Sequence, residues 1–209
     1  MGLMKSYFGN TRKPSGILGK MMLSGMNREH AAVSDWGLTH IDDLHPQTIA
    51  ELGCGGGRNA AALLQRFPSS QVVALDYSEE AVQKTADLNR DAVASGRCRT
   101  VQGDVSHMPL DDGSFDLACA FETVYFWPGP TKSFAEVSRI LKPGGIFLIV
   151  NESDGTDPGD EKWKGIIDGL EIYTAAELGG YLREAGFAGV RVDQEKERHW
   201  LCLRAQKQQ

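Results

Sequence analysis

A glycine-rich turn is the first stretch of the chain whose residue types could do chemistry. Residues 49–64 read IAELGCGGGRNAAALL, so four glycines fall within five positions between an apolar run and an alanine-rich segment. Glycine lets a backbone approach a ligand closely, and the first turn of a helix offers free N–H groups to it. A turn of this kind between a strand and a helix predicts a ligand cradle.

The spacing of these glycines excludes one common ligand of such turns. A dinucleotide-binding turn follows the pattern G-x-G-x-x-G. Counted from Gly53 the third glycine would stand at position 58, which is Arg58, and counted from Gly55 it would stand at Ala60. The pattern present instead is acid-x-Gly-x-Gly-x-Gly over residues 51–57.

The elements around this turn alternate between strand-like and helix-like segments. Short, almost wholly apolar strands between helices are typical of a parallel sheet that is covered on both faces. The last two strands are separated by too few residues for a crossover, so they must be antiparallel. We expect an α/β fold with a Rossmann-like, mostly parallel seven-stranded sheet, an antiparallel C-terminal strand and helices on both faces. The expected strands are 48–53, 71–77, 98–104, 114–122, 146–152, 190–197 and 199–206, and the expected helices are 58–67, 78–96, 132–141 and 174–187.

Two segments stand outside this alternation. Residues 1–45, with methionines at 21, 22 and 26, are interpreted as an N-terminal helical cap or lid segment. Residues 46–209 form the ligand-binding domain. Within it, residues 153–173 are predicted to be an irregular insert after the fifth strand, where ligands of such sheets bind. We therefore expect this insert to act as a lid.

Four landmarks, in order along the chain, carry a family resemblance. They are the acid-Gly turn at residues 51–57, Asp76 at the end of the second strand, GDVSHMPLDDGSFD after the third, and RILKPGG before the fifth. With them the chain resembles the class I S-adenosylmethionine-dependent methyltransferases, and within these the type 11 group that includes ubiquinone and menaquinone biosynthesis enzymes. The resemblance is strong over about residues 48–150. It does not extend to the N-terminal segment or the insert, so a quinone substrate does not carry over.

The resemblance implies an S-adenosylmethionine site. In it Asp76 accepts hydrogen bonds from the two ribose hydroxyls, Asp104 binds the adenine amino group beside the Val105 N–H, and Phe121 lines the methionine part. Tyr77 packs against adenine or belongs to the core, and Glu51 holds either the loop or the ligand amine. The full predicted set is Glu51, Gly53, Cys54, Gly55, Gly57, Asp76, Tyr77, Asp104, Val105 and Phe121.

The implied reaction is methyl transfer to an O, N, S or C atom of a small-molecule acceptor. The cofactor's sulfonium already activates the methyl group, so no catalytic triad or metal is required, and we expect no metal site. Candidates on the acceptor side are Tyr7, His30, Glu122, Tyr125 and Trp127. Packing under a proline-rich loop is an equal alternative for the last two, and a surface position is the commoner role of a lone histidine. Five acids and no base within residues 152–161 indicate either a solvated loop or attraction for a cationic amine.

Composition sets further limits. The formal net charge of −6 argues against a nucleic-acid partner, and no apolar run reaches the length of a membrane span. Four widely spaced cysteines without a CxxC pair predict core thiols in a reducing, cytoplasmic compartment.

Two other functions compete with methyl transfer. One is a non-catalytic S-adenosylmethionine-binding regulatory protein, which the same cofactor residues would serve. The other is a nicotinamide-dependent oxidoreductase, against which Arg58 and the antiparallel final strands argue.

Overall fold

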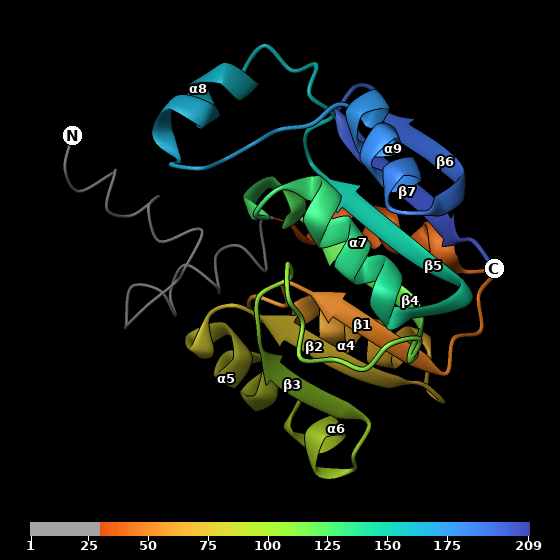
Figure 1. Cartoon of the computed structure of the whole chain (residues 1–209). Coiled ribbons are helices and arrows are strands. Elements are labelled where there is room, and N and C mark those ends of the chain that lie inside the picture. The colour runs from red at the N-terminus through yellow and green to blue at the C-terminus, as the bar shows by residue number, and fades with distance from the viewer. Residues whose placement is uncertain (1–29) are drawn as a thin grey trace.

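A seven-stranded sheet forms the centre of the molecule in the computed structural model, which describes residues 30–209. The strand order is β3-β2-β1-β4-β5-β7-β6 (Figure 1). The first five strands are parallel, and β7 runs antiparallel to both β5 and β6. This confirms the predicted fold class. The strands are β1 Thr48–Leu52, β2 Gln71–Asp76, β3 Cys98–Gln102, β4 Phe115–Phe121, β5 Leu141–Asn151, β6 Phe187–Glu195 and β7 Trp200–Lys207.

Helices pack on both faces of the sheet, and each face has its own apolar core. Apolar side chains of α7 and α9 meet one face, and those of α3 and α4 meet the other. Strands β1, β4 and β5 are buried on both sides as a result, which is why they read as apolar runs. The helices are α3 Ala31–Leu38, α4 Arg58–Arg66, α5 Glu79–Leu88, α6 Arg90–Ala94, α7 Pro130–Ile140, α8 Asp160–Ile166 and α9 Ala175–Glu184, with short 3-10 turns η1 Thr39–Ile41 and η2 Val124–Phe126.

Several elements differ from the sequence expectation, among them β6, which begins at Phe187 and not at residue 190. The helix predicted over 78–96 is two helices, because the side chain of Asn89 turns inward and donates to the carbonyls of Gly57 and Thr85 at 3.1 and 2.9 Å. Strand β5 begins at Leu141, so Pro143 and the glycines after it lie within the strand. The insert is not wholly irregular, since it contains α8.

The described part of the N-terminal segment packs on the sheet. Gly37 of α3 lies so close to β5 that an added Cβ would stand 2.4 Å from a methyl carbon of Val150. Trp36 contacts Trp200 of β7, with ring centroids 5.8 Å apart. Tyr7 and the methionines at 21, 22 and 26 lie outside the described residues.

Asp116 joins three strands at their amino-terminal edge, opposite the glycine turn. Its carboxylate accepts hydrogen bonds from the N–H groups of Gln47 and Thr48, both at 2.9 Å, and from Nζ of Lys142 at 2.7 Å. Burial alone would raise the pKa of Asp116, but these donors hold it below its ordinary value. Among residues 30–209 no helix is both long and apolar enough to cross a bilayer.

Candidate active site

The glycine turn is fixed to the neighbouring strand β2. The N–H groups of Gly53 and Cys54 both donate to the carbonyl of Leu75, at 2.8 and 3.0 Å. At the end of β2, the Asp76 carboxylate accepts from the N–H of Gly55 and the N–H of Ser78, both at 2.9 Å. The parallel register of β1 and β2 therefore brings the turn and Asp76 together, as the sequence predicts.

Two of the predicted glycines are required by contacts within the protein. Gly53 and Gly57 have φ of +86° and +81°. A Cβ at Gly53 would stand 2.4 Å from Cγ2 of Thr123, and one at Gly57 would stand 2.7 Å from Cα of Thr85. The expectation that these glycines serve the approach of a ligand is thus incomplete, because the first allows the turn to pack on the chain after β4 and the second allows α4 to pack on α5.

Glu51 carries a buried carboxylate that lacks a partner. The residue is 1% exposed, and its Oε2 has no hydrogen-bond donor among the described residues. Burial, reinforced by the nearby Asp76 carboxylate, raises the pKa of Glu51 well above its ordinary value. A buried acid in this state is suited to a cationic ligand group, such as the amine of the cofactor's methionine part.

Asp76 is held in place by backbone N–H groups around it. Burial raises its pKa, and hydrogen bonds from the N–H groups of Ser78, Gly55 and Tyr77 partly offset that rise. The bonds from Gly55 and Ser78 reach different carboxylate oxygens. The carboxylate is therefore fixed at the end of β2, beside the glycine turn.

The residues predicted to hold adenine lie on the loops after β2 and β3. The N–H of Gly103 donates to the carbonyl of Asp76 at 2.9 Å, which places the Asp104 loop beside the end of β2. Asp104 forms a local turn in which Oδ1 accepts the N–H of Ser106 at 2.8 Å, and this bond is the main cause that lowers its pKa. Val105 is partly buried against the core. Tyr77 is 49% exposed, so the alternative of a core aromatic is wrong for it.

Two cavities lie at the carboxyl edge of the sheet. The smaller one, about 60 Å³, adjoins the glycine turn. Its walls include Gly53, Cys54, Gly55 and Phe121 from the predicted set, and also His30, Ser34, Gly56, Arg58, Asn59, Glu122 and Thr123. The larger one, about 490 Å³, is lined by His30, Glu122, Tyr125, Phe126, Glu152, Ser153, Asp157, Asp160, Trp163, Ile167, Leu170, Ile172, Arg198 and Trp200. His30 and Glu122 line both cavities, so the two cavities meet at these residues.

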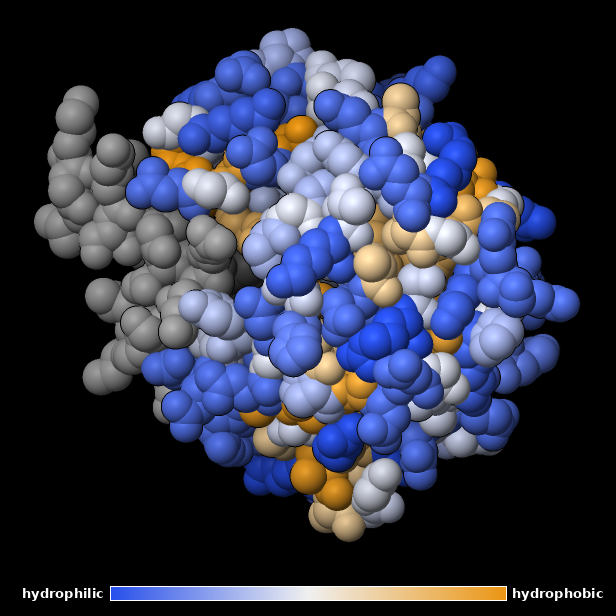
Figure 2. Space-filling view, viewed as in Figure 1, coloured by the Kyte–Doolittle hydropathy of each residue, from blue (hydrophilic) through white to orange (hydrophobic). Residues whose placement is uncertain are grey.

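The insert supplies half of the larger cavity's walls, and Tyr125 connects to both of its ends. The hydroxyl of Tyr125 accepts the N–H of Ser153 at 3.0 Å, and its carbonyl accepts the N–H of Glu171 at 2.9 Å. Burial, with the neighbouring carboxylate of Glu122, raises the pKa of Tyr125 well above its ordinary value. Figure 1 shows α8 standing away from the sheet, and Figure 2 shows apolar surface gathered around it on an otherwise largely hydrophilic face.

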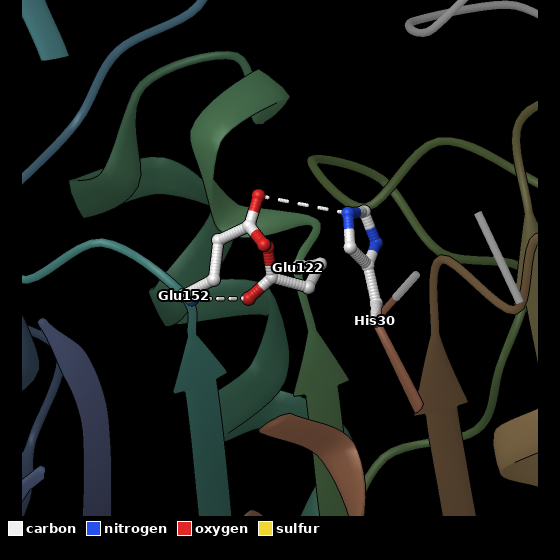
Figure 3. A group of neighbouring side chains, drawn as sticks. All are labelled: His30, Glu122 and Glu152. Atoms are coloured by element: carbon white, nitrogen blue, oxygen red, sulfur yellow. Dashed lines mark hydrogen bonds and ion pairs between the residues drawn. The ribbon is translucent and has the colours of Figure 1, made fainter. Parts of the chain in front are cut away.

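Glu122 lies in an unusual backbone and electrostatic position. Its φ is +60°, it is 7% exposed, and its side chain accepts the N–H of Glu152. Burial, with the adjacent Glu152 carboxylate, raises the pKa of Glu122 well above its ordinary value. Figure 3 shows the side chains of His30, Glu122 and Glu152 turned toward one another.

The structure separates the acceptor-side candidates. His30, Glu122 and Tyr125 line the larger cavity, whereas Trp127 lines neither cavity. The Trp127 ring stacks on Phe147 in the core, with centroids 6.1 Å apart, so packing is the correct interpretation. Tyr7 lies outside the described residues. Sequence reasoning missed Ser34, Glu152, Arg198 and Trp200 as wall residues, and for Glu152 the available signal was an acid placed directly after a buried strand.

Comparison with known proteins agrees with this geometry. Residues 50–149 match the family model described as a methyltransferase domain. Cycloartenol-C-24-methyltransferase 1 of Oryza sativa is 31% identical over 126 residues, which are 59% of this chain and 36% of that protein. The malonyl-[acyl-carrier protein] O-methyltransferase of Dechloromonas aromatica is 34% identical over 116 residues, covering 56% of this chain and 40% of that protein. The matched part therefore spans less than half the length of these curated relatives.

Solved structures share the fold across most of the chain. The protein solved in complex with the Haloferax volcanii Trm112 methyltransferase activator has a TM-score of 0.81 at 22% identity and covers 91% of this chain and 94% of its own. The geranyl diphosphate C-methyltransferase of Streptomyces coelicolor, solved with Mg²⁺, geranyl-S-thiolodiphosphate and S-adenosyl-L-homocysteine, has a TM-score of 0.74 at 14% identity and covers 85% and 76%. The match over residues 50–149 identifies a methyltransferase domain of the type 11 group in this chain, as the resemblance predicts, and the solved structures share its fold.

Proposed function

We propose that this protein transfers the methyl group of S-adenosylmethionine to a small-molecule acceptor held in the larger cavity. The observation that carries the proposal is the junction of the two cavities at His30 and Glu122. The cofactor's methionine part would lie along the glycine turn, and its methyl group would point through the junction. Methyl transfer requires the nucleophile, methyl carbon and sulfur to be in line and shielded from water, and the insert, which supplies half of the larger cavity's walls, would provide that shielding.

The proposed cofactor roles follow from where the residues lie around the glycine turn and the ends of β2 and β3. Glu51 would receive the ammonium group, Asp76 the ribose hydroxyls, and Asp104 with the Val105 N–H the adenine edge. Tyr77 is exposed beside Asp76 and would cover the adenine ring, while Phe121 would bound the methionine part. By their names, the relatives reported above methylate cycloartenol and malonyl-[acyl-carrier protein], which supports an organic acceptor. Four buried, unpaired cysteines support a reducing, cytoplasmic compartment.

The first test is calorimetric titration of the purified full chain with S-adenosylhomocysteine, with NADH as comparator. We expect micromolar binding of S-adenosylhomocysteine, a strong loss of affinity in Asp76→Ala, and no binding of NADH. Thermal unfolding of the variant checks that it is folded. Tight binding of NADH without S-adenosylhomocysteine would overturn the proposal.

The second test is turnover. Methyl-labelled S-adenosylmethionine is incubated with the protein and a panel of acceptors that present hydroxyl, amine, thiol or activated carbon atoms. Label transferred to one acceptor class supports the enzyme. Cofactor binding without transfer to any acceptor favours the regulatory alternative.

A further inference from the structure

Three side chains with metal-binding atoms meet where the two cavities join. His30 precedes α3, Glu122 follows β4 and Glu152 follows β5, so three separate segments contribute. Strands β4 and β5 are neighbours, and Phe121 pairs with Val150, which places the acids after them side by side. One ligand atom from each of the three residues lies within 4.8 Å of the other two (Figure 3).

Glu122 leaves one carboxylate oxygen available to this group. The residue is more than nine-tenths buried, and its Oε1 accepts the N–H of Glu152. Within residues 30–209 the other oxygen has no hydrogen-bond donor, and the residue lines both cavities. A carboxylate oxygen that faces a cavity without a protein donor, next to a second carboxylate, is suited to a cation.

The separation of the histidine and the second acid suits a shared ion. Nε2 of His30 and Oε1 of Glu152 are 3.6 Å apart, which is too long for a hydrogen bond. Two ligand atoms that each lie about 2.1 Å from one tetrahedral ion are about 3.4 Å apart. The side chains therefore stand close to the spacing of ligands around a common ion.

The other charged residues of the larger cavity are already engaged. Both carboxylate oxygens of Asp160 accept the hydroxyl of Ser153 at 2.8 Å, and Asp157 accepts the N–H of Gly159 at 2.7 Å. The guanidinium of Arg198 lies over the ring of Trp200, 4.7 Å from its centroid. Asp157 and Asp160 are thus held by hydrogen bonds within the insert, whereas Glu122 and Glu152 stand together beside His30 at the junction of the cavities.

We propose that His30, Glu122 and Glu152 bind a divalent first-row transition-metal ion, of the Mn²⁺ or Zn²⁺ type, at the junction of the cavities. One imidazole with two carboxylates suits such ions better than the all-oxygen sites of Ca²⁺ and Mg²⁺. Three protein ligands leave coordination positions open toward the larger cavity, where an oxygen of the acceptor or a water molecule binds. The role in holding the acceptor rests on the proposed methyl transfer, but binding of the ion does not. The sequence alone led us to expect no metal site, because the three ligands share no local spacing.

Metal binding is tested without turnover. The full chain is stripped with a chelator and titrated by calorimetry with Zn²⁺ and with Mn²⁺, and free Mn²⁺ is followed by electron paramagnetic resonance. We expect one ion per chain with micromolar affinity for at least one of the two metals. His30→Asn, Glu122→Gln and Glu152→Gln should each weaken binding by at least about tenfold, since each removes a ligand. Glu161→Gln, an exposed acid on α8, is the matched control and should bind as the unmodified protein does.

Binding of S-adenosylhomocysteine separates failure of this proposal from failure of the proposed function. Glu152→Gln should keep that binding, because Glu152 does not line the cavity at the glycine turn. Absence of metal binding up to millimolar concentrations, with and without S-adenosylhomocysteine, would overturn the metal site. Equal metal affinity in the three ligand variants would overturn it as well. Binding of tetramethylammonium that is lost in Glu122→Gln, in a protein that binds no metal, would assign the acids to a cationic acceptor instead.

Discussion

Replacing Glu51 by Gln tests the most distinctive electrostatic feature of the cofactor site. The change keeps the shape of the side chain and removes the charge from a carboxylate that is buried without a full set of partners. If Glu51 receives the ammonium group of the cofactor, the variant loses a charge-assisted hydrogen bond worth about 1.5–3 kcal/mol. The dissociation constant of S-adenosylhomocysteine should then rise by about 10- to 150-fold.

The same substitution has a predicted effect on the pH dependence of stability. The pKa of Glu51 is raised in the folded protein, so folding favours its protonated form. Its unfavourable effect on folding therefore grows as pH rises above the unfolded pKa and levels off above the folded pKa. Glu51→Gln should remove this contribution and make the fall of the unfolding free energy with rising pH shallower. The cofactor instead selects the ionised form, so its binding should release protons to the buffer in the unmodified protein and fewer in the variant.

The assay is calorimetric titration in two buffers of different ionisation enthalpy, together with urea unfolding at several pH values. Asp116→Asn is the matched control, because Asp116 lies at the opposite edge of the sheet and its carboxylate is fully engaged. That variant should lose about 1.5–3 kcal/mol of stability and keep the affinity for S-adenosylhomocysteine. Equal affinity and equal proton release in Glu51→Gln and the unmodified protein would refute the assignment of Glu51 to the ligand amine.

Three further outcomes are expected. Gly53→Ala should lower the free energy of unfolding, measured in urea, by about 2–5 kcal/mol, against about 1–2 kcal/mol for Gly113→Ala. Both positions have a positive φ, but of the two only Gly53 would place the new Cβ against another side chain. Equal losses in the two variants would contradict this. Trp127→Phe should lose about 1–3 kcal/mol of stability and keep the affinity for S-adenosylhomocysteine, since Trp127 packs in the core. Weakened binding at unchanged stability would instead show that Trp127 contacts the ligand. Burial alone would raise the pKa of Asp154, but its hydrogen bonds, including one with His199, hold that pKa below its ordinary value. The ionised carboxylate therefore stabilises the folded state above the unfolded pKa, and this stabilisation is lost as pH falls through the folded pKa. Asp154→Asn should accordingly speed amide hydrogen exchange in residues 153–157 at neutral pH, relative to the unmodified protein. The two proteins should differ less at acid pH, where the carboxylate of the unmodified protein is also neutral. Equal exchange in both proteins at both pH values would refute a stabilising contact between Asp154 of the insert and His199, which lies between β6 and β7.

The parts of the structure that local chemistry determines could be predicted from the sequence. Strands buried on both faces leave continuous apolar runs, and the glycine turn with Asp76 lies on two adjacent strands joined by one helix. The break at Asn89 was missed because it depends on a side chain reaching the carbonyl of Gly57, far away in the sequence. The role of Trp127 stayed open for a similar reason, since an aromatic residue after β4 suits a cavity wall and a core equally well until its neighbour Phe147 is known.

The acceptor side could not be assembled from the sequence because its walls come from the segment before α3, the ends of β4 and β5, the insert and the β6–β7 turn. The parallel topology nevertheless explains why acids gather there. Four parallel strands each carry an acid at their last residue or next to it, namely Glu51, Asp76, Glu122 and Glu152. All four acids therefore lie at the same edge of the sheet. S-adenosylmethionine carries a sulfonium and an ammonium charge, whereas the thioether product keeps only the ammonium. The carboxylates of Glu51 and Asp76, which border the glycine turn, therefore favour the methyl donor over its product, and transfer of the methyl group itself weakens the attraction that holds the cofactor in place.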